Sequence, residues 1–236
     1  VMVFLSSILG LRLIEAYRLE LYLHMGSLFS AVLYYREDII DSIKSYGISF
    51  NNSLLRLWVI TTIVSVVTGY PIYIVYQKIL GNVSLDVATS IIGVSLIITG
   101  LLLMYAKSKK NYRTFKDLGI KDYIVLGIAQ GISIIPGISR SGITIAVLLL
   151  LGLHSSDAVK TSFLASIPII ALASIYIGLF QGYIVSIVGL IGMLSALGAG
   201  LIGLWVMVFI SKKLPLYYFA LTIGLIMVLA TIPFII

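Results

Sequence analysis

The residues of this sequence that could do chemistry gather in one short stretch around a single arginine. Arg140 is the only basic residue between Tyr123 and Leu153. The glycines and hydroxyl-bearing residues beside it are Gly137, Ser139, Ser141, Gly142 and Thr144. A guanidinium fork, hydroxyls and exposed backbone amides together favour an anion, and phosphate fits their geometry best. The stretch therefore predicts an anion site at the N-terminus of a helix that begins near Ile143.

A structural interpretation competes with this one, because backbone carbonyls at a helix break could satisfy Arg140. A guanidinium at membrane depth is costly unless it is paired or wetted, so some partner must offset that cost. The cluster of glycines and hydroxyls favours an anionic partner over carbonyls. His24 is a further candidate, since an ionisable residue inside an apolar segment is a suspected functional group. A histidine satisfied by its surroundings explains His24 equally well.

These residues lie in a chain that belongs in a membrane. Of its 236 residues, 60% are hydrophobic and 11% are charged, and its mean hydropathy is +1.14. A water-soluble domain usually carries about 25% charged residues. The composition excludes a soluble enzyme and a nucleic-acid-binding module, and the absence of Cys excludes a disulfide framework and a thiolate metal site. The sequence predicts an all-α polytopic membrane protein.

Six apolar segments are each long enough to cross roughly 30 Å of bilayer hydrocarbon as a helix. They run from about Ala16 to Tyr35, Leu54 to Tyr76, Leu85 to Ala106, Ala158 to Phe180, Tyr183 to Ile210 and Leu216 to Ile236. Another apolar segment, Tyr123 to Leu153, is interrupted by the run from Pro136 to Gly142, so a helix cannot run through it unbroken. The polar segment Glu37 to Ser53 is predicted to be a loop.

Lysines and arginines concentrate in the segment 107–122, which predicts a cytoplasmic loop there. The interrupted segment that follows must then enter and leave the membrane on the same side. It is therefore predicted to be a re-entrant helical hairpin rather than a seventh crossing.

The chain also carries a weak internal repeat. A shift of 142 residues places 9–11 (Leu-Gly-Leu) on 151–153, and further along a shift of 131 residues places 92–93 (Ile-Gly) on 223–224. Three crossings in each half give the halves opposite orientation, which is the inverted-repeat architecture with a site near the membrane midplane. The single membrane domain 1–236 then consists of a first repeat, 1–106, the basic loop 107–122 and a second repeat, 123–236.

One stretch carries a family resemblance. It reads GIAQGISIIPGISRSGITIAVLLLLGL, followed by TSFLASIPII, and it closely resembles the second signature of the undecaprenyl-pyrophosphate phosphatase family. That signature has a Gln-rich entry, Pro-Gly-x-Ser-Arg-Ser-Gly-x-Thr and a Ser-Phe-Leu-x-x-Ile-Pro segment. The resemblance implies that Arg140 grips a pyrophosphate and that Ser139 touches or attacks a phosphorus. Thr144 is predicted to join them in the catalytic group, and the predicted substrate-binding residues are Gly137, Ser141, Gly142, Gln130 and His24.

The family's first signature, a Glu-rich hairpin with Glu-Phe/Trp-Leu-Pro-Val-Ser-Ser, is absent from the 236 residues. The repeat offset places it just before Val1. The resemblance implies that its carboxylates hold a divalent cation, Mg²⁺ or Ca²⁺, so no metal ligand is predicted within the sequence itself. We expect little or no pyrophosphatase activity from these residues alone, and activity from a chain extended upstream by about 25 to 35 residues.

The predicted function is hydrolysis of a polyprenyl pyrophosphate to the monophosphate at the plasma membrane, which recycles the lipid carrier of cell-envelope glycans. Its expected partners are that lipid and the membrane lipids, with no nucleic acid, and the sequence indicates no oligomeric state. An acid-phosphatase-type enzyme is excluded, because its pattern requires His where the chain has Ala146. Two alternatives stay open: a transporter or flippase with the same inverted repeat, and a non-catalytic truncated homologue.

Overall fold

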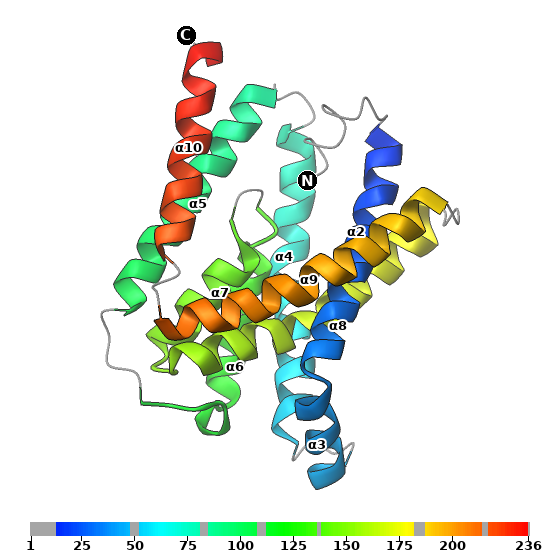
Figure 1. Cartoon of the computed structure of the whole chain (residues 1–236), viewed down its shortest axis with the longest axis vertical. Coiled ribbons are helices and arrows are strands. Elements are labelled where there is room, and N and C mark those ends of the chain that lie inside the picture. Colours follow the sequence, from blue (N-terminus) through cyan, green and yellow to red (C-terminus); the bar gives the residue numbers. More distant parts are fainter. Residues whose placement is uncertain are drawn as a thin grey trace. The chain divides into compact units, whose positions relative to one another are not determined.

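The structure is a computed structural model that describes residues 13–47, 52–80, 85–107, 112–135, 138–181, 187–213 and 217–235. In these ranges the regular elements are helical, apart from one isolated bridge between Arg113 and Leu153 (Figure 1). The helices are α2 (Leu13–Tyr34), α3 (Arg36–Tyr46), α4 (Ser53–Leu80), α5 (Leu85–Lys107), α6 (Ile120–Ile132), α7 (Arg140–Leu150), α8 (Ser155–Gln181), α9 (Ile187–Lys213) and α10 (Tyr217–Ile235), with the short turn η1 (Phe115–Asp117) before α6. The predicted all-α class is confirmed.

The six predicted membrane segments coincide with the long helices α2, α4, α5, α8, α9 and α10, and their ends differ from prediction by only a few residues. Among the described residues, three stretches are long and apolar enough to cross a membrane: Ser53–Val75, Ser155–Tyr176 and Ile187–Phe209. Large apolar side chains of α9 are exposed, among them Ile202 at 66%, as expected for a helix that faces lipid. The protein is thus a polytopic membrane protein, and the total of six spans stays a prediction.

Two predictions about the polar connections are wrong. The predicted loop from Glu37 to Ser53 contains α3, whose first turn holds Glu37 and Asp38 and whose last turn holds Lys44. Acidic side chains at the start of a helix and a basic one at its end complement the helix dipole, which explains why this polar segment is helical. The basic segment 107–122 is also not a loop throughout, because α6 already begins at Ile120.

The described helices divide into two compact units. One unit contains α2, α3 and the parts of α8 and α9 between Ser166 and Met207. The other, which we call the hairpin unit, contains α4 to α7, α8 up to Ala165, the end of α9 from Val208, and α10. Each unit takes helices from both predicted repeats. Arg140 and the hydroxyls beside it belong to the hairpin unit, whereas His24 belongs to the other unit.

In the unit that contains His24, α2 and α9 pack through glycines. A Cβ added at Gly26 would overlap the backbone carbonyl of Met193, and one added at Gly189 would overlap the ring of Tyr22. Larger side chains at either position would force the two helices apart, so the glycines determine how closely α2 and α9 approach.

In the hairpin unit, α6 packs closely along α4. A Cβ added at Gly127 of α6 would lie 2.7 Å from the Cβ of Val64, and one added at Gly131 would lie 3.0 Å from the backbone nitrogen of Gly69. The close approach brings Ser65 Oγ on α4 to 3.1 Å from the carbonyl oxygen of Gly127, so its one O–H is shared between this carbonyl and that of Thr61. Glycines on α6 therefore allow a hydroxyl on α4 to reach the α6 backbone.

Two glycines also bring α5 and α10 together, and the two helices lie side by side in Figure 1. A Cβ added at Gly93 would lie 3.0 Å from the carbonyl oxygen of Gly224, and one added at Gly224 would lie 2.8 Å from the carbonyl oxygen of Gly93. A two-fold axis produces contacts that are reciprocal in this way. The same two glycines are equivalent positions in the internal repeat of the sequence.

A proline in α8 frees a backbone carbonyl that α4 satisfies. Pro168 has no N–H, so the carbonyl of Leu164, four residues earlier, has no donor within the helix. The indole Nε1 of Trp58 on α4 donates to that carbonyl over 2.8 Å. Hydrocarbon offers no alternative donor, so this bond both satisfies the carbonyl and holds this part of α8 against α4.

The interrupted apolar segment forms a helical hairpin. α6 ends at Ile132, α7 begins at Arg140, and the two helices pack against each other. The segment is thus interrupted as predicted, but the predicted break from Pro136 to Gly142 extends too far, because Arg140 to Gly142 already belong to α7. Pro136 and Gly137 themselves lie outside the described residues. That the hairpin enters and leaves a membrane on one side stays a prediction.

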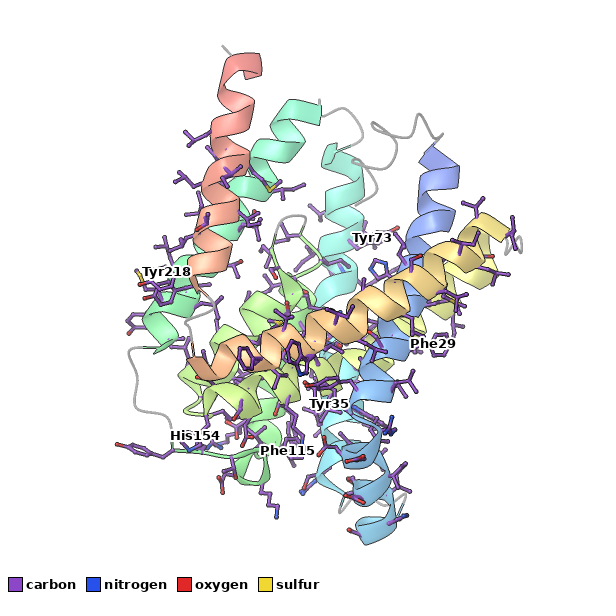
Figure 2. The ribbon with its side chains drawn as sticks, in the orientation of Figure 1. Phe29, Tyr35, Tyr73, Phe115, His154 and Tyr218 are labelled. Carbon is purple, nitrogen blue, oxygen red and sulfur yellow. The ribbon has the colours of Figure 1, made fainter. Side chains whose placement is uncertain are left out.

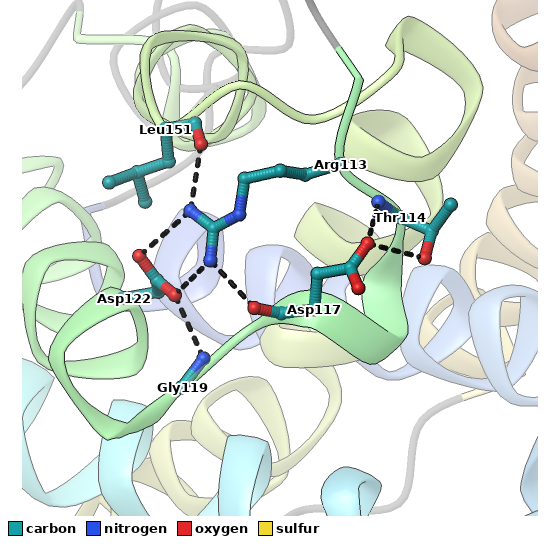
Figure 3. Close-up of polar contacts among 6 residues, drawn as sticks. All are labelled: Arg113, Thr114, Asp117, Gly119, Asp122 and Leu151. Carbon is teal, nitrogen blue, oxygen red and sulfur yellow. Dashed lines mark hydrogen bonds and ion pairs between the residues drawn. The ribbon is translucent and has the colours of Figure 1, made fainter.

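One arginine ties the two ends of the hairpin together (Figure 3). Arg113 Nη2 donates to Asp122 Oδ2 in the first turn of α6 over 2.7 Å, and Nη1 donates to the carbonyl of Leu151 after α7 over 2.8 Å. The backbone of Arg113 also donates to the carbonyl of Gly152 over 2.9 Å, in a turn where Gly152 has a φ of 89°. We call these contacts the Arg113 clasp.

The same connection reaches the start of α8. The backbone N–H of Phe115 donates to Asp157 Oδ2 over 3.2 Å, and the backbone N–H of His154 donates to the carbonyl of Arg113 over 3.0 Å. His154 is exposed (Figure 2). The polar connection therefore holds the start of α6, the end of α7 and the start of α8 together.

Asp122 makes the clasp sensitive to pH. Burial raises the pKa of this carboxyl, but hydrogen bonds from Arg113 and from the amide of Gly119, with the charge of Arg113, outweigh burial and hold the pKa below its usual value. A carboxyl with a lowered pKa stabilises the fold above its unfolded pKa of about 3.9, and the stabilisation is lost as the pH falls through the folded pKa.

We therefore expect the thermal unfolding midpoint in detergent to fall as the pH is lowered from about 5 to about 3. Asp122→Asn should lower the midpoint at pH 7 by about 2–4 °C, because a partly exposed ion pair contributes about 1 kcal/mol. The midpoint of the variant should also depend less on pH. Asp41→Asn, exposed on α3, is the matched control. Identical pH profiles for Asp122→Asn and the wild type would contradict a stabilising role for the clasp.

Candidate functional site

The candidate site is built on the first turn of α7. Ser139 is the N-cap residue, with φ −63° and ψ 112°, and its Oγ accepts a hydrogen bond from the amide of Gly142 over 3.2 Å. An N-cap hydroxyl satisfies one of the free amides that every helix has at its start. α7 therefore begins at Arg140, and the prediction that it begins near Ile143 is wrong by most of a turn.

Arg140 is the first residue of α7, and its side chain is half-buried. Its guanidinium forms no hydrogen bond or ion pair with any residue that the structure describes. Described backbone carbonyls therefore do not satisfy it, which argues against the structural interpretation of this residue. The amides of Arg140 and Ser141 also have no acceptor within the helix, because they lie in its first turn. An unpaired cation and free amides at one helix N-terminus suit an anion.

Gly142 allows α5 to approach this turn. A Cβ added at Gly142 would overlap Thr99 Cγ2 on α5 and would lie 3.1 Å from the Cβ of Ser139. Thr99 is buried, and its Oγ1 donates to the carbonyl of Ser95 over 2.9 Å, so its methyl group cannot easily turn away. Packing alone thus requires glycine at position 142, and its amide is already used by Ser139.

Thr144 lies one turn further along α7 and is buried. Its Oγ1 lies 2.7 Å from the carbonyl oxygen of Arg140, 3.2 Å from that of Ser141 and 2.6 Å from Ser162 Oγ on α8. Ser162 is absent from the predicted site residues. Its signal in the sequence is its place in the Ser-Phe-Leu-x-x-Ile-Pro segment, which by itself indicates no contact with α7.

The other predicted site residues have different surroundings. Ser141 Oγ lies 3.5 Å from Ser139 Oγ, at the limit of a hydrogen bond. Gln130 lies on α6 with 4% of its surface exposed, and neither polar atom of its amide has a hydrogen-bond partner in the structure. Gly137 lies outside the described residues. His24 is exposed in the other unit, so its role stays a prediction.

A metal site is not evident in the described part of the chain. Within these ranges no group of three or more His, Asp or Glu side chains could hold a metal ion. Mg²⁺ and Ca²⁺ are bound by carboxylate and carbonyl oxygens and by water, whereas the side chains assembled around Arg140 are hydroxyls and a guanidinium. The described residues therefore do not fit the divalent cation that the family resemblance implies.

Comparison with known protein families shows which family the chain belongs to. The family model described as Bacitracin resistance protein BacA matches residues 1–232. The chain belongs to this family. Membership of the BacA family confirms the predicted resemblance, and it agrees with the membrane helices found in the structure.

Relatives in the BacA family carry the name undecaprenyl-diphosphatase. The protein of Sulfurisphaera tokodaii is 34% identical over 226 residues, which are 92% of this chain and 83% of the relative. That of Saccharolobus islandicus is 34% identical over 234 residues, 95% of this chain and 85% of the relative. That of Methanococcoides burtonii is 32% identical over 228 residues, 93% of this chain and 85% of the relative.

The packing of Gly142 against Thr99 predicts that a second substitution, at Thr99, restores what a substitution at Gly142 disrupts. Gly142→Ala should destabilise the protein by about 1–3 kcal/mol and displace the first turn of α7, because the added methyl overlaps Thr99 Cγ2. Thr99→Ser removes that methyl while keeping the hydroxyl that bonds to Ser95. The double variant should therefore recover stability and pyrophosphate binding, measured by thermal unfolding in detergent with and without inorganic pyrophosphate. No recovery in the double variant would contradict this account of Gly142.

Proposed function

We propose that this protein hydrolyses undecaprenyl diphosphate, or a closely related polyprenyl pyrophosphate, to the monophosphate and inorganic phosphate. The observation that carries the proposal is the guanidinium of Arg140, which is half-buried at the N-terminus of α7 and unpaired among the described residues. Membership of the BacA family and the name undecaprenyl-diphosphatase of the relatives support the same substrate.

In the proposed reaction, the bond between the terminal phosphorus and the bridging oxygen breaks. The oxygen of water ends on the released phosphate, and the bridging oxygen stays with the lipid monophosphate. Negative charge grows on the phosphoryl oxygens as this bond breaks, and catalysis depends on stabilising that charge. Arg140 does so through two parallel N–H donors of its planar fork, and the free amides of the first turn of α7 donate to further oxygens.

Ser139 has one of two roles in this reaction. As a nucleophile, its Oγ attacks the terminal phosphorus, the lipid monophosphate leaves, and water then hydrolyses the phosphoserine. As a donor, its O–H bonds to a phosphoryl oxygen while its Oγ continues to accept from the Gly142 amide. The described partners of Ser139 Oγ are that amide and Ser141 Oγ, and neither is a base strong enough to take a proton. This favours the donor role.

The other predicted site residues complete the proposal. Thr144 lies one turn after Arg140 on α7, and Ser141, Gly142 and Gly137 contribute to the surface that contacts the phosphates. The unpartnered amide of Gln130 supports a role in binding a polar group, and His24 is a further substrate contact. A requirement for Mg²⁺ or Ca²⁺ rests on the family resemblance alone.

The membrane arrangement is part of the proposal. Six helices span the plasma membrane in two inverted repeats, the α6–α7 hairpin is re-entrant, and the basic connection before α6 faces the cytoplasm. The reciprocal contact between Gly93 and Gly224 supports a two-fold relation of the repeats. The backbone amides at the start of α7, which have no acceptor among the described residues, also fit this arrangement, because broken helices in membranes point their N-termini at anionic substrates.

The decisive test compares Arg140→Lys with the wild type. A compact ammonium cannot reproduce two parallel hydrogen bonds to a pyrophosphate, so we expect kcat/KM for phosphate release from undecaprenyl diphosphate in detergent to fall about 10- to 100-fold. The measurement uses a form of the protein for which wild-type turnover is detected. Near-wild-type turnover by Arg140→Lys would contradict Arg140 as the phosphate anchor. Movement of labelled lipid across sealed vesicles without phosphate release would instead indicate a transporter.

A pair of substitutions distinguishes the two roles of Ser139. Ser139→Ala removes both the cap and the hydroxyl, whereas Ser139→Asn keeps a good N-cap acceptor. If Ser139 only caps the helix and donates a hydrogen bond, Ser139→Ala should cost about 1 kcal/mol of stability and Ser139→Asn should cost less. Both variants should then lose less turnover than Arg140→Ala. Complete loss in both variants, with a trapped phosphoserine in the wild type, would make Ser139 the nucleophile. Mass spectrometry of the quenched reaction detects that intermediate.

A further inference from the structure

A chain of hydroxyl groups links α8 to the backbone of Arg140. Ser162 Oγ on α8 lies 2.6 Å from Thr144 Oγ1 on α7, and Thr144 Oγ1 lies 2.7 Å from the carbonyl oxygen of Arg140. Ser162 is 3% exposed and Thr144 is 1% exposed, so water does not compete for these bonds. In such surroundings a hydrogen bond is stronger than at a surface, and an unmade one is costly.

The protons of this chain have a definite direction. The carbonyl of Arg140 can only accept, so the single O–H of Thr144 donates to it or to the more distant carbonyl of Ser141. The Thr144 oxygen must then accept from the O–H of Ser162. Thr144 therefore has no O–H left to donate to a phosphate, and its lone pairs would only repel one.

The part of α8 around Ser162 is firmly held. Val159, one turn before it, is fully buried, and the carbonyl of Leu164 accepts the Trp58 indole over 2.8 Å. Ser162 thus joins the first turn of α7 to a segment that α4 already fixes in place. Movement of the α7 turn relative to α8 would break the bond between the two hydroxyls.

We infer that Ser162 is a positioning residue for the hydrolysis, because it holds, through Thr144, the helical turn that carries Arg140. This inference rests on the proposed function. It changes the role of Thr144, which is predicted from the sequence to belong to the catalytic group. Thr144 acts on the backbone of Arg140 and does not contact the substrate. The pair also adds α8 to the elements that build the site.

A double-mutant cycle on the two hydroxyls tests the inference. Ser162→Ala and Thr144→Val each remove one hydroxyl, and each should lower kcat/KM for undecaprenyl diphosphate about 3- to 10-fold. The double variant should lose about as much kcat/KM as the worse single variant and no more, because both changes break the same hydrogen bond. Thr144→Ser keeps the hydroxyl and should lie closer to the wild type than Thr144→Val does. Ser174→Ala is the matched control, because it removes a buried hydroxyl of α8 that has no hydrogen-bond partner in the structure.

Hydrogen exchange separates this inference from the proposed function. Ser162→Ala should speed exchange of the amides at the start of α7, in peptides that cover 140–150, and Ser174→Ala should not. If the wild type releases no phosphate but Ser162→Ala speeds this exchange, the proposed function fails while the support of the turn stands. Unchanged exchange, or additive losses of kcat/KM in the double variant, would overturn the positioning role of Ser162.

Discussion

The hydrogen bond from the Gly142 amide to Ser139 Oγ determines where α7 begins, and the candidate site follows from that point. A helix N-terminus leaves several amides without acceptors within the helix, and a capping side chain or a ligand can satisfy them. Ser139 satisfies one of these amides, while those of Arg140 and Ser141 have no acceptor among the described residues and lie beside a positive side chain. An anion that enters this position meets donors that are already oriented, so little reorganisation is needed.

The turn is useful only if it is held in place, and neighbouring elements of the hairpin unit hold it. Thr99 of α5 packs on Gly142, and Ser162 of α8 bonds to Thr144. The Arg113 clasp fixes the ends of the hairpin, far along the chain from its break. The two supports at the turn itself, Thr99 on Gly142 and Ser162 on Thr144, use small residues and hydroxyls, which allow helices to approach closely without introducing charge. A turn held in this way can keep Arg140 oriented although no described residue pairs with its guanidinium.

Much of this arrangement could be predicted from the sequence, because long apolar segments and interrupted ones carry strong signals. The six long helices and the break in the hairpin fall where hydropathy, proline and glycine place them. α3 was hidden by its polar composition, although Glu37, Asp38 and Lys44 mark its two ends. Ser162 could not be predicted, because its contact with Thr144 depends on which face of α8 points toward α7. In a helix that is apolar on all sides, hydropathy does not indicate which face that is. The clasp was equally hidden, because clustered basic residues usually indicate a solvated loop.

Two of the arginines in the hairpin unit, Arg113 and Arg140, have opposite surroundings. They distinguish an arginine that supports the fold from one that is proposed to act on the substrate. Arg113 donates to Asp122, to the carbonyl of Leu151 and to the carbonyl of Asp117, so its donors serve the fold. Arg140 has none of these partners among the described residues, although it is half-buried and an acidic neighbour would stabilise it. A carboxylate beside Arg140 would compete with a phosphate for the same fork and would cancel the charge that attracts it. Because no described residue occupies the donors of Arg140, they are available to an anion, whereas those of Arg113 are not. Arg140 is therefore the one of these two arginines that suits the proposed substrate.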